Sequence, residues 1–375
     1  MKKNPIYQAL SIILRNTGRS LQILKYGLIE HGWLRVTDLE HELKVFVGDQ
    51  RKQPVLVDVG LFIKTGDLQA SIGAAQSLDA KEFPGEISTG QQEVEIPPKV
   101  LHGLSELLPA ASADDSRGVL KCVFVNRKKR GEAVATDGHF LLLKKLDTAL
   151  KESFLIDAIS LKISSLFVDN ITRCTVSHKV TDKDAAGRGA SDLTYLIISG
   201  DGWQLVSKVP EATEYPSYRK AIPDRSNAVA VPWDNVLKAE VDAFLEKSKA
   251  FTNPKSHLVH LTAKEGIVRN RELSYLRKTD FSKDILALKP EQVIGLDAEL
   301  LYAVLRYIGN RPVSVTVGET MVNPVVFHGE NFLALIMPLK TGESGAGITR
   351  AELLKEEGGK TAAILALENQ MKKAA

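Results

Sequence analysis

The chain has 375 residues, of which 44% are hydrophobic and 25% charged, enough for two or three domains with buried cores. Its 49 basic and 46 acidic side chains leave a formal net charge of +3, which is too small to indicate nucleic-acid binding by itself. No apolar run is long enough to span a membrane, and Lys2 and Lys3 precede no apolar core of the kind found in signal peptides. Two cysteines, Cys122 and Cys174, cannot form a disulfide framework. We therefore expect a cytoplasmic protein with buried thiols.

The first 93 residues predict a helix followed by short strands. The helix spans residues 6–15. Strands are expected near residues 21–29, 33–36 and 43–47. A fourth strand leads into a second helix at Asp58, a residue type that caps helix N-termini. The interval from Asp58 to the next start signal at Pro98 is short, so this first part of the chain is expected to be abbreviated.

From residue 94 onward one unit recurs: a short apolar strand, a helix start signal, an amphipathic helix, and then further strands separated by turns. The start signals are Pro98, Asp157, Pro232 and Asp297. They predict helices over residues 99–108, 157–167, 233–245 and 300–308, the last ended by Gly309. Repetition at a long period indicates one supersecondary unit used several times.

The units predict an α+β protein with two units in each full-length domain. The expected domains are residues 1–93, abbreviated, then 94–225 and 226–341. Residues 342–375 form a C-terminal extension that is expected to be partly helical or disordered. Its helical form would cover a nearby surface or contact another protomer.

Five short motifs follow one another in order along residues 5–340. They are Thr37–Glu40 (TDLE), Glu82–Pro84 (EFP), Val134–His139 (VATDGH), Tyr215–Pro223 (YPSYRKAIP) and Ile336–Lys340 (IMPLK). Their order and distances resemble those of the bacterial sliding clamp, the β subunit of DNA polymerase III. The ordered set is far more specific than any one tetrapeptide.

The resemblance implies a three-domain sliding-clamp (DNA clamp) fold built of repeated β-α-β-β-β units, in which two protomers form a ring with helices inside. It implies a processivity factor of DNA replication that does no bond-making chemistry, a homodimer that encircles double-stranded DNA without reading its sequence. The implied partners are the catalytic subunit of the replicative DNA polymerase, a clamp loader and other clamp-motif proteins. Neither a cofactor nor a metal ion is expected.

A ring that slides needs weak attraction to phosphates, which basic side chains on the helices would supply. The candidate DNA-facing residues are Arg15, Arg19, Lys99, Lys162, Lys238, Lys247 and Arg306, with Lys249 and Arg311 as further candidates. Arg19 falls where the family has a first-domain arginine that reaches DNA. The alternative for each residue is an ordinary solvated helix face.

The resemblance also implies a hydrophobic cleft that receives short partner peptides containing a glutamine and a few apolar side chains. Carried over by motif, its lining is Thr136, Gly138, His139, Phe140, Leu141, Pro223, Met337, Pro338 and Leu339, with Leu120 and Val229 added by their positions in the repeat. Apolar anchors in a preformed pocket allow a short peptide to bind. Phe140 stands where the family has an arginine, and it is expected to enlarge the apolar wall of the cleft.

Two other functions stay open. The abbreviated first domain is compatible with a clamp-like protein that binds peptides without closing a ring around DNA. The second alternative is a hydrolase that uses His139 and Asp137. Against it, the sequence has no nucleophile motif, no phosphate-binding loop and no His or Cys cluster with the spacing of metal ligands. Asp137 and Gly138 instead indicate a tight turn between strands.

Overall fold

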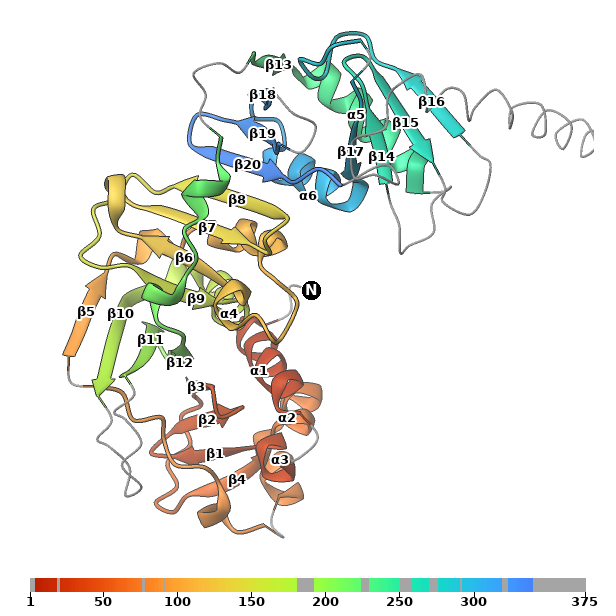
Figure 1. Cartoon of the computed structure of the whole chain (residues 1–375). Coiled ribbons are helices and arrows are strands. Elements are labelled where there is room, and N and C mark those ends of the chain that lie inside the picture. The colour runs from red at the N-terminus through yellow and green to blue at the C-terminus, as the bar shows by residue number, and fades with distance from the viewer. Residues whose placement is uncertain are drawn as a thin grey trace, which may run out of the picture. The chain divides into compact units, whose positions relative to one another are not determined.

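The computed structural model describes residues 4–18, 21–75, 78–90, 92–180, 192–223, 229–249, 258–269, 276–290, 292–318 and 323–339. The chain divides into two compact units, each described by itself below (Figure 1). The first unit comprises Met1–Ala135 and Lys145–Tyr215, and the second comprises Thr136–Lys144 and Pro216–Ala375. Among the described residues, no helix has the length and apolar character that crossing a bilayer requires.

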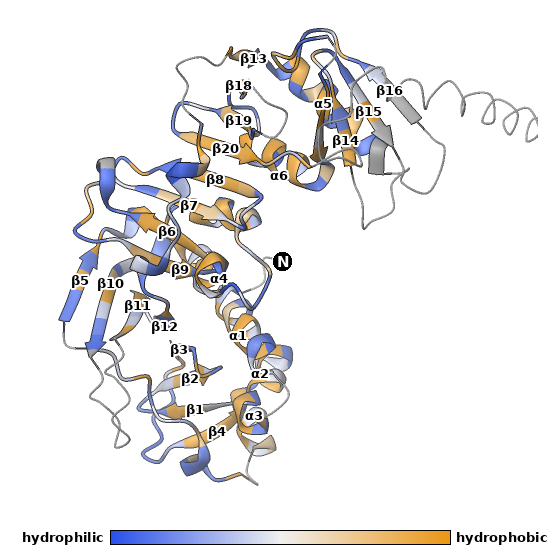
Figure 2. Ribbon diagram, in the orientation of Figure 1, coloured by the Kyte–Doolittle hydropathy of each residue, from blue (hydrophilic) through white to orange (hydrophobic). Residues whose placement is uncertain are grey.

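The first unit contains an antiparallel sheet of eight strands in the order β4-β1-β2-β3-β12-β11-β10-β5. The strands are β1 (Tyr26–Glu30), β2 (Trp33–Thr37), β3 (His41–Phe46), β4 (Val55–Asp58), β5 (Gln92–Ile96), β10 (Ile171–Val180), β11 (Asp192–Gly200) and β12 (Trp203–Val209). Leu43 of β3 lies opposite Leu205 of β12, so strands distant in sequence share one sheet. The edge strand β5 is largely hydrophilic (Figure 2), a composition that discourages pairing with other chains.

Four helices lie along one side of this sheet (Figure 1). They are α1 (Pro5–Asn16), α2 (Val59–Thr65), α3 (Leu68–Ala74) and α4 (Ala158–Leu166). The caps predicted from the sequence are confirmed, because the Asp58 carboxylate accepts the backbone N–H of Leu61 and the Asp157 carboxylate accepts that of Ser160. Helix α1 packs against α4 and α2 through Ala9, Leu10 and Ile13, none of which is exposed.

The helix predicted over residues 99–108 is wrong. Two short 3-10 helices occupy this region, Pro98–Leu101 and Leu104–Ala110. Gly103 separates them with a left-handed backbone at φ 71°, which ends a right-handed helix. A proline, Pro109, lies inside the second segment, where an α-helix would lose a hydrogen bond.

The first unit also contains β6 (Cys122–Asn126) between β9 (Phe154–Asp157) and β7 (Glu132–Thr136). Cys122 begins β6 and Cys174 lies in β10, and both thiols are buried as predicted. Burial raises the pKa of each thiol to about 12, so both stay protonated at neutral pH.

An extended segment replaces strands at the end of the first 93 residues. Between Ala74 and Gln92 the described residues contain no strand, only a 3-10 turn at Ala80–Glu82. The following residues 83–90, here called the strap, cross the sheet. Phe83 packs on Leu28 and Leu56, and the backbone N–H of Ile87 donates to Glu42 Oε2 at 3.1 Å. The strap therefore covers apolar side chains of the sheet but forms no strand that pairs with it.

The second unit contains two antiparallel groups of strands. One has the order β13-β18-β19-β20-β8 and the other β16-β15-β14-β17. The strands are β8 (Phe140–Lys145), β13 (Val231–Trp233), β14 (Leu258–Leu261), β15 (Glu265–Arg269), β16 (Leu276–Asp280), β17 (Ile294–Asp297), β18 (Val313–Val317), β19 (Val325–His328) and β20 (Phe332–Ile336). Strand β8 comes from the middle of the sequence and pairs with β20 near the end.

Two helices, α5 (Asn235–Lys249) and α6 (Ala298–Ile308), complete the second unit. The predicted signals of α6 are confirmed, because Asp297 caps its start and Gly309 ends it at φ 55°. Trp233 is buried and its indole N–H donates to the carbonyl of Ile285 at 2.7 Å, so the largest side chain of this core is also satisfied as a donor.

Candidate functional site

The Thr136–Phe140 segment is a tight turn closed by its own side chains. Thr136 Oγ1 donates to the carbonyl of Phe140 at 2.6 Å and accepts from the N–H of Gly138 at 3.0 Å. Asp137 Oδ1 accepts the N–H groups of His139 and Phe140, both at 2.8 Å. Gly138 has φ 95°, a conformation that glycine adopts without strain. The predicted turn is therefore present, and the Asp137 carboxylate holds it.

The chain that follows β20 is held beside this turn. Ile336 lies opposite Phe140, and the N–H of Met337 donates to the carbonyl of His139 at 2.8 Å. The N–H of Leu339 donates to the carbonyl of Gly295 at 2.9 Å. These bonds fix the backbone of residues 337–339 and leave its side chains at the surface.

The surface formed here combines exposed apolar groups with a fixed backbone. Gly138 and His139 are exposed, Met337 and Pro338 are half-buried, and Leu339 is 40% exposed. We call these five residues the junction patch. A rigid backbone that presents apolar side chains can bind a short peptide with little ordering cost.

The other residues predicted for the cleft lie in different surroundings. Phe140 is not exposed at all and Leu141 is 2% exposed, so the prediction that Phe140 enlarges a surface wall is wrong: its ring belongs to the core behind β8. Thr136 is also buried, with its hydroxyl committed to the turn. Pro223 is half-buried and Val229 is 68% exposed. Leu120, in the 3-10 turn Gly118–Lys121 of the first unit, is half-buried.

Most predicted DNA-facing cations are exposed on helices. Arg15 lies on α1, Lys162 on α4, Lys247 on α5 and Arg306 on α6, and Lys99 is exposed on its 3-10 turn. Arg19 lies outside the described residues. Each of these four α-helices therefore carries one of the cations predicted to meet phosphate.

Lys238 is a correction to this set. It is only 6% exposed, and its Nζ donates to the carbonyls of Gly309 at 3.0 Å and Arg311 at 2.8 Å. Burial and the neighbouring Arg311 charge lower the pKa of Lys238. The ammonium satisfies carbonyls just beyond the end of α6 and is not available to DNA. Arg311 is also engaged, with its guanidinium 4.1 Å from the centre of the Phe332 ring.

Replacing Lys238 by Met is expected to lower the free energy of unfolding by about 2 kcal/mol, because the carbonyls of Gly309 and Arg311 lose the donor that the buried ammonium supplies. Urea denaturation of the full chain measures this change. The matched control is Lys247→Met on the exposed face of the same helix, where a change within about 0.5 kcal/mol is expected. Equal effects of the two substitutions would contradict the buried role of Lys238.

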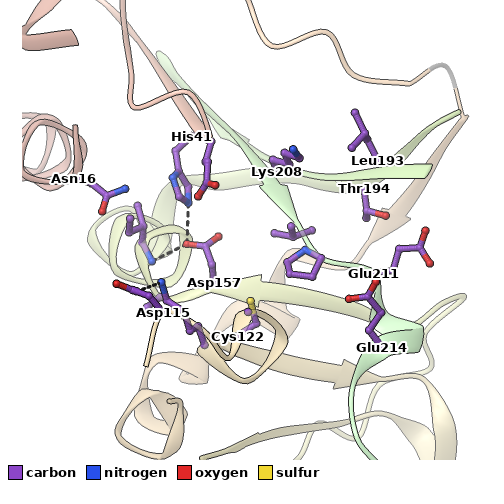
Figure 3. Close-up of a pocket in the computed structure, with 17 residues that line it drawn as sticks. Asn16, His41, Asp115, Cys122, Asp157, Leu193, Thr194, Lys208, Glu211 and Glu214 are labelled. Carbon is purple, nitrogen blue, oxygen red and sulfur yellow. Dashed lines mark hydrogen bonds and ion pairs between the residues drawn. The ribbon is translucent and has the colours of Figure 1, made fainter. Parts of the chain in front are cut away.

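A cavity of about 510 Å³ lies in the first unit, where β12 ends (Figure 3). Its polar lining comes from several elements: Glu40, His41, Asp115, Lys121, Asp157, Lys208, Glu211 and Glu214. Its apolar lining comes from Ile159, Leu193, Val209 and Pro210. No sequence motif predicts this cavity, because its lining residues come from segments far apart in the chain.

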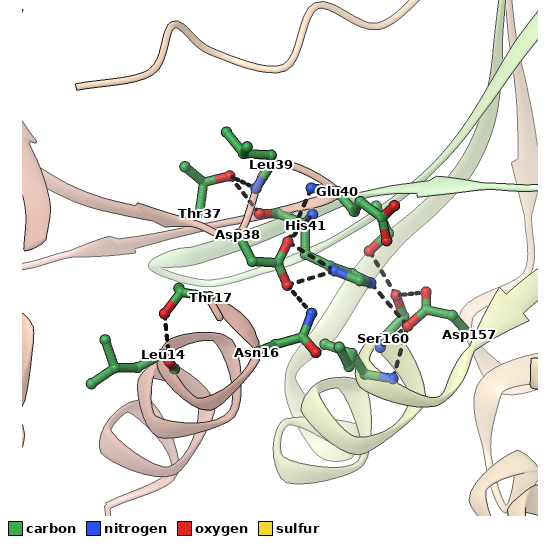
Figure 4. A network of polar contacts seen from close by, with 12 residues as sticks. Leu14, Asn16, Thr17, Thr37, Asp38, Leu39, Glu40, His41, Asp157 and Ser160 are labelled. Carbon is green, nitrogen blue, oxygen red and sulfur yellow. Dashed lines mark hydrogen bonds and ion pairs between the residues drawn. The ribbon is translucent and has the colours of Figure 1, made fainter. Parts of the chain in front are cut away.

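His41 lies beside the cavity and joins two carboxylates (Figure 4). Its Nδ1 donates to Asp38 Oδ2 and its Nε2 to Asp157 Oδ1, both at 3.0 Å, and the residue is 4% exposed. Burial by itself would lower the pKa of His41, but hydrogen bonds and attraction from Asp157 and Asp38 raise it to about 10. At neutral pH the imidazole is a cation between two anions, which ties the β2–β3 turn to the start of α4.

Among the described residues, no group of three or more His, Cys, Asp or Glu side chains is arranged to hold a metal ion. The residues around His139 and Asp137 form a tight turn beside exposed apolar side chains, whereas His41 makes a buried ionic contact.

Helices along one side of antiparallel sheets, with strands from distant segments joined in continuous sheets, define an α+β fold of the sliding-clamp class. Solved structures of bacterial clamps share this fold. The Caulobacter crescentus polymerase III β subunit has a TM-score of 0.66 at 18% identity, and the match covers 91% of this chain and 99% of that one. The Thermotoga maritima β subunit has a TM-score of 0.67 at 17% identity, covering 90% and 98%.

The polymerase β subunit of Streptococcus pyogenes gives a similar result, with a TM-score of 0.64 at 16% identity and coverage of 90% and 98%. No protein-family model and no curated protein sequence matches the chain. The structural matches therefore confirm the predicted sliding-clamp fold and the resemblance to polymerase III β clamps. The sequence identity to these clamps is 16–18%.

Proposed function

We propose that this chain is a DNA polymerase III β sliding clamp, a non-catalytic processivity factor for DNA replication. The observation that carries the proposal is the clamp fold, which matches nearly the whole length of the solved clamps and about nine-tenths of this chain. The protein would act in the cytoplasm as a homodimer that encircles double-stranded DNA. Its domains would be residues 1–93, 94–225 and 226–341, followed by the extension 342–375.

The proposed hold on DNA is electrostatic and independent of sequence. Arg15, Lys162, Lys247 and Arg306 are exposed on four different helices, and Lys99 and Arg19 would add to them. Long flexible cations contact phosphate oxygens without reading base edges, and each contact is weak enough to exchange as the ring moves. Enclosure, and not affinity, would then keep the protein on DNA.

The proposed docking site for the polymerase catalytic subunit and other clamp-motif proteins is the junction patch, and we include Pro223 and Val229 of the same unit in the proposal. Its exposed Leu339 and half-buried Met337 supply apolar anchors. Met337 is unbranched and adapts to partners of different shape. A Caulobacter clamp structure carries polyethylene glycol at a region described as tethering the β-motif, and a Bartonella birtlesii clamp is bound to griselimycin. Such ligands support a small-molecule-sized site in this fold.

The decisive experiment compares retention on closed and open DNA. A clamp loader with ATP places the labelled full-length protein on nicked circular plasmid, and gel filtration follows its release before and after linearisation. We expect retention on the circle, loss after linearisation, and a solution mass of twice the 41.1 kDa chain. Equal release from circular and linear DNA, with a monomeric mass, would leave a peptide-binding protein that does not enclose DNA.

A further inference from the structure

The hydrogen-bonded turn at residues 136–140, which carries Gly138 and His139 of the junction patch, has a counterpart elsewhere in the chain. Thr37 Oγ1 donates to the carbonyl of His41 at 2.7 Å, and Asp38 Oδ1 accepts the N–H of His41 at 2.7 Å. These bonds match those that Thr136 and Asp137 make to Phe140. The turn at residues 37–41 is therefore built like the turn at residues 136–140, with His41 in the place of Phe140.

The strand beside each turn also corresponds. Ser207 of β12 lies opposite His41, and the N–H of Lys208 donates to the carbonyl of Glu40 at 2.8 Å. At the turn of residues 136–140, Ile336 lies opposite Phe140 and the N–H of Met337 donates to the carbonyl of His139 at the same distance. Residues 208–210 thus hold the position of residues 337–339. The 510 Å³ cavity lies at this second position.

The chemistry of the cavity differs from that of the junction patch. Lys121 is paired with Asp115 at 2.6 Å and His41 with Asp157 at 3.0 Å, so these charges largely cancel. Among the described residues, no ion pair is formed by Glu40, Glu211, Glu214 or Lys208, which all line the cavity. Lys121 also attracts Glu40, and Glu211 Oε2 accepts the Thr213 hydroxyl at 3.1 Å. The three carboxylates still outnumber the Lys208 ammonium, which leaves an excess of negative charge. Figure 3 shows Glu211 and Glu214 on the opposite side of the cavity from Asp115.

Charge and shape together select the occupant. A cavity of this volume is large enough for a few side chains of a bound segment. Its carboxylates favour a cationic group, and Ile159, Leu193 and Pro210 favour an apolar neighbour. The same negative charge repels DNA phosphates. The occupant that fits is a polypeptide segment with a Lys or Arg side chain next to apolar ones.

We propose that this cavity is a second docking site, which binds a basic and apolar segment of a partner protein. The proposal rests on the proposed clamp function for its biological setting, and it adds a site with charge preference opposite to that of the DNA-facing helices. One chain would then bind a partner at the junction patch and at the cavity, two sites whose backbone conformations are similar and whose side chains differ in charge. Two-point attachment raises overall affinity without strengthening either contact.

The test measures binding of a fluorescein-labelled Leu-Lys-Leu-Arg-Leu peptide, blocked at both ends, to the full-length protein by anisotropy. Saturable binding is expected, with Glu in place of Lys and Arg abolishing it. The variant Glu211→Gln/Glu214→Gln is expected to weaken binding about fivefold, the effect of two partly exposed charge contacts. The matched control Asp169→Asn/Asp201→Asn removes the same charge from exposed positions that do not line the cavity, and it is expected to leave affinity unchanged.

Equal loss in the two double variants would overturn the proposal, because binding would then follow net charge alone. Saturable binding of the acidic peptide would also overturn it. A Met337→Ala/Leu339→Ala variant separates this test from the proposed function: it removes the apolar side chains of the junction patch and is expected to bind the basic peptide normally. Loss of the basic peptide in that variant would place binding at the junction patch and reject the second site.

Discussion

Replacing His41 by Gln is expected to lower the free energy of unfolding by about 3 kcal/mol at pH 7, in the range found when one partner of a buried ion pair is removed. The substitution retains a side chain of similar reach but removes the charge shared by Asp38 and Asp157, which are 3.0 Å from the imidazole nitrogens. The two carboxylates, whose side chains are 1% and 17% exposed, then lose the cation between them. Urea denaturation, followed by circular dichroism on the full chain, measures the change.

The same contact sets a pH dependence with a definite sign. The pKa of His41 is about 10 in the folded protein against 6.5 for the unperturbed side chain. Its contribution is therefore complete below pH 6.5 and is lost as the pH rises through 10. Burial would raise the pKa values of Asp38 and Asp157, but His41 lowers both below 3.8. Their contribution is complete above this value and is lost as the pH falls.

Wild-type stability is thus expected to decline between pH 6.5 and 10, and His41→Gln is expected to flatten that decline. The matched control is His139→Gln at the corresponding turn, where the side chain is exposed and a small change is expected. A wild-type profile that stays level across this interval, or a His41→Gln variant as stable as the control, would show that His41 is not the buried cation described above.

The double substitution Met337→Ala/Leu339→Ala is expected to weaken binding of a clamp-motif peptide about 30-fold, equivalent to about 2 kcal/mol. The backbone of residues 337–339 is held by His139 and Gly295, so truncation removes anchors without displacing the chain. Fluorescence anisotropy with a labelled peptide containing a glutamine and apolar residues measures the effect.

The control for this prediction is Val236→Ala, an apolar side chain 62% exposed on α5, which lies outside the junction patch. It should leave peptide affinity within about twofold of the wild type. The anchoring role of Met337 and Leu339 fails if their double variant binds as tightly as this control.

Structural features that depend on contacts within a few residues can be predicted from this sequence. Asp58, Asp157 and Asp297 each cap the helix they were expected to start, because capping depends on a side chain and N–H groups two or three residues away. The Asp137–Gly138 turn followed for the same reason. The helix over 99–108 failed because Gly103 adopts a left-handed backbone that the apolar periodicity does not register.

Signals that depend on distant contacts were not readable. A lysine in a helix is usually exposed to solvent, and the sequence predicts this for Lys238. Its ammonium instead binds carbonyls of residues more than 70 positions later in the sequence. The motif predicts a surface position for Phe140, whereas Phe140 is not exposed in β8, which pairs with β20. Asp157, 116 residues away in the sequence, helps to raise the pKa of His41 and so keeps its imidazole protonated. No local sequence pattern predicts that contact.

The duplicated turn shows which atoms a copied scaffold retains and which it can change. Both copies keep the threonine hydroxyl and the aspartate carboxylate that close the loop, while the next three positions read Leu39, Glu40 and His41 in one and Gly138, His139 and Phe140 in the other. Leu39 even occupies its place at φ 80°, a strained geometry for a branched residue. A turn of this kind can change its surface chemistry by exchanging the two exposed residues that follow the aspartate, and a protein engineer could alter either turn without redesigning the strands that carry it.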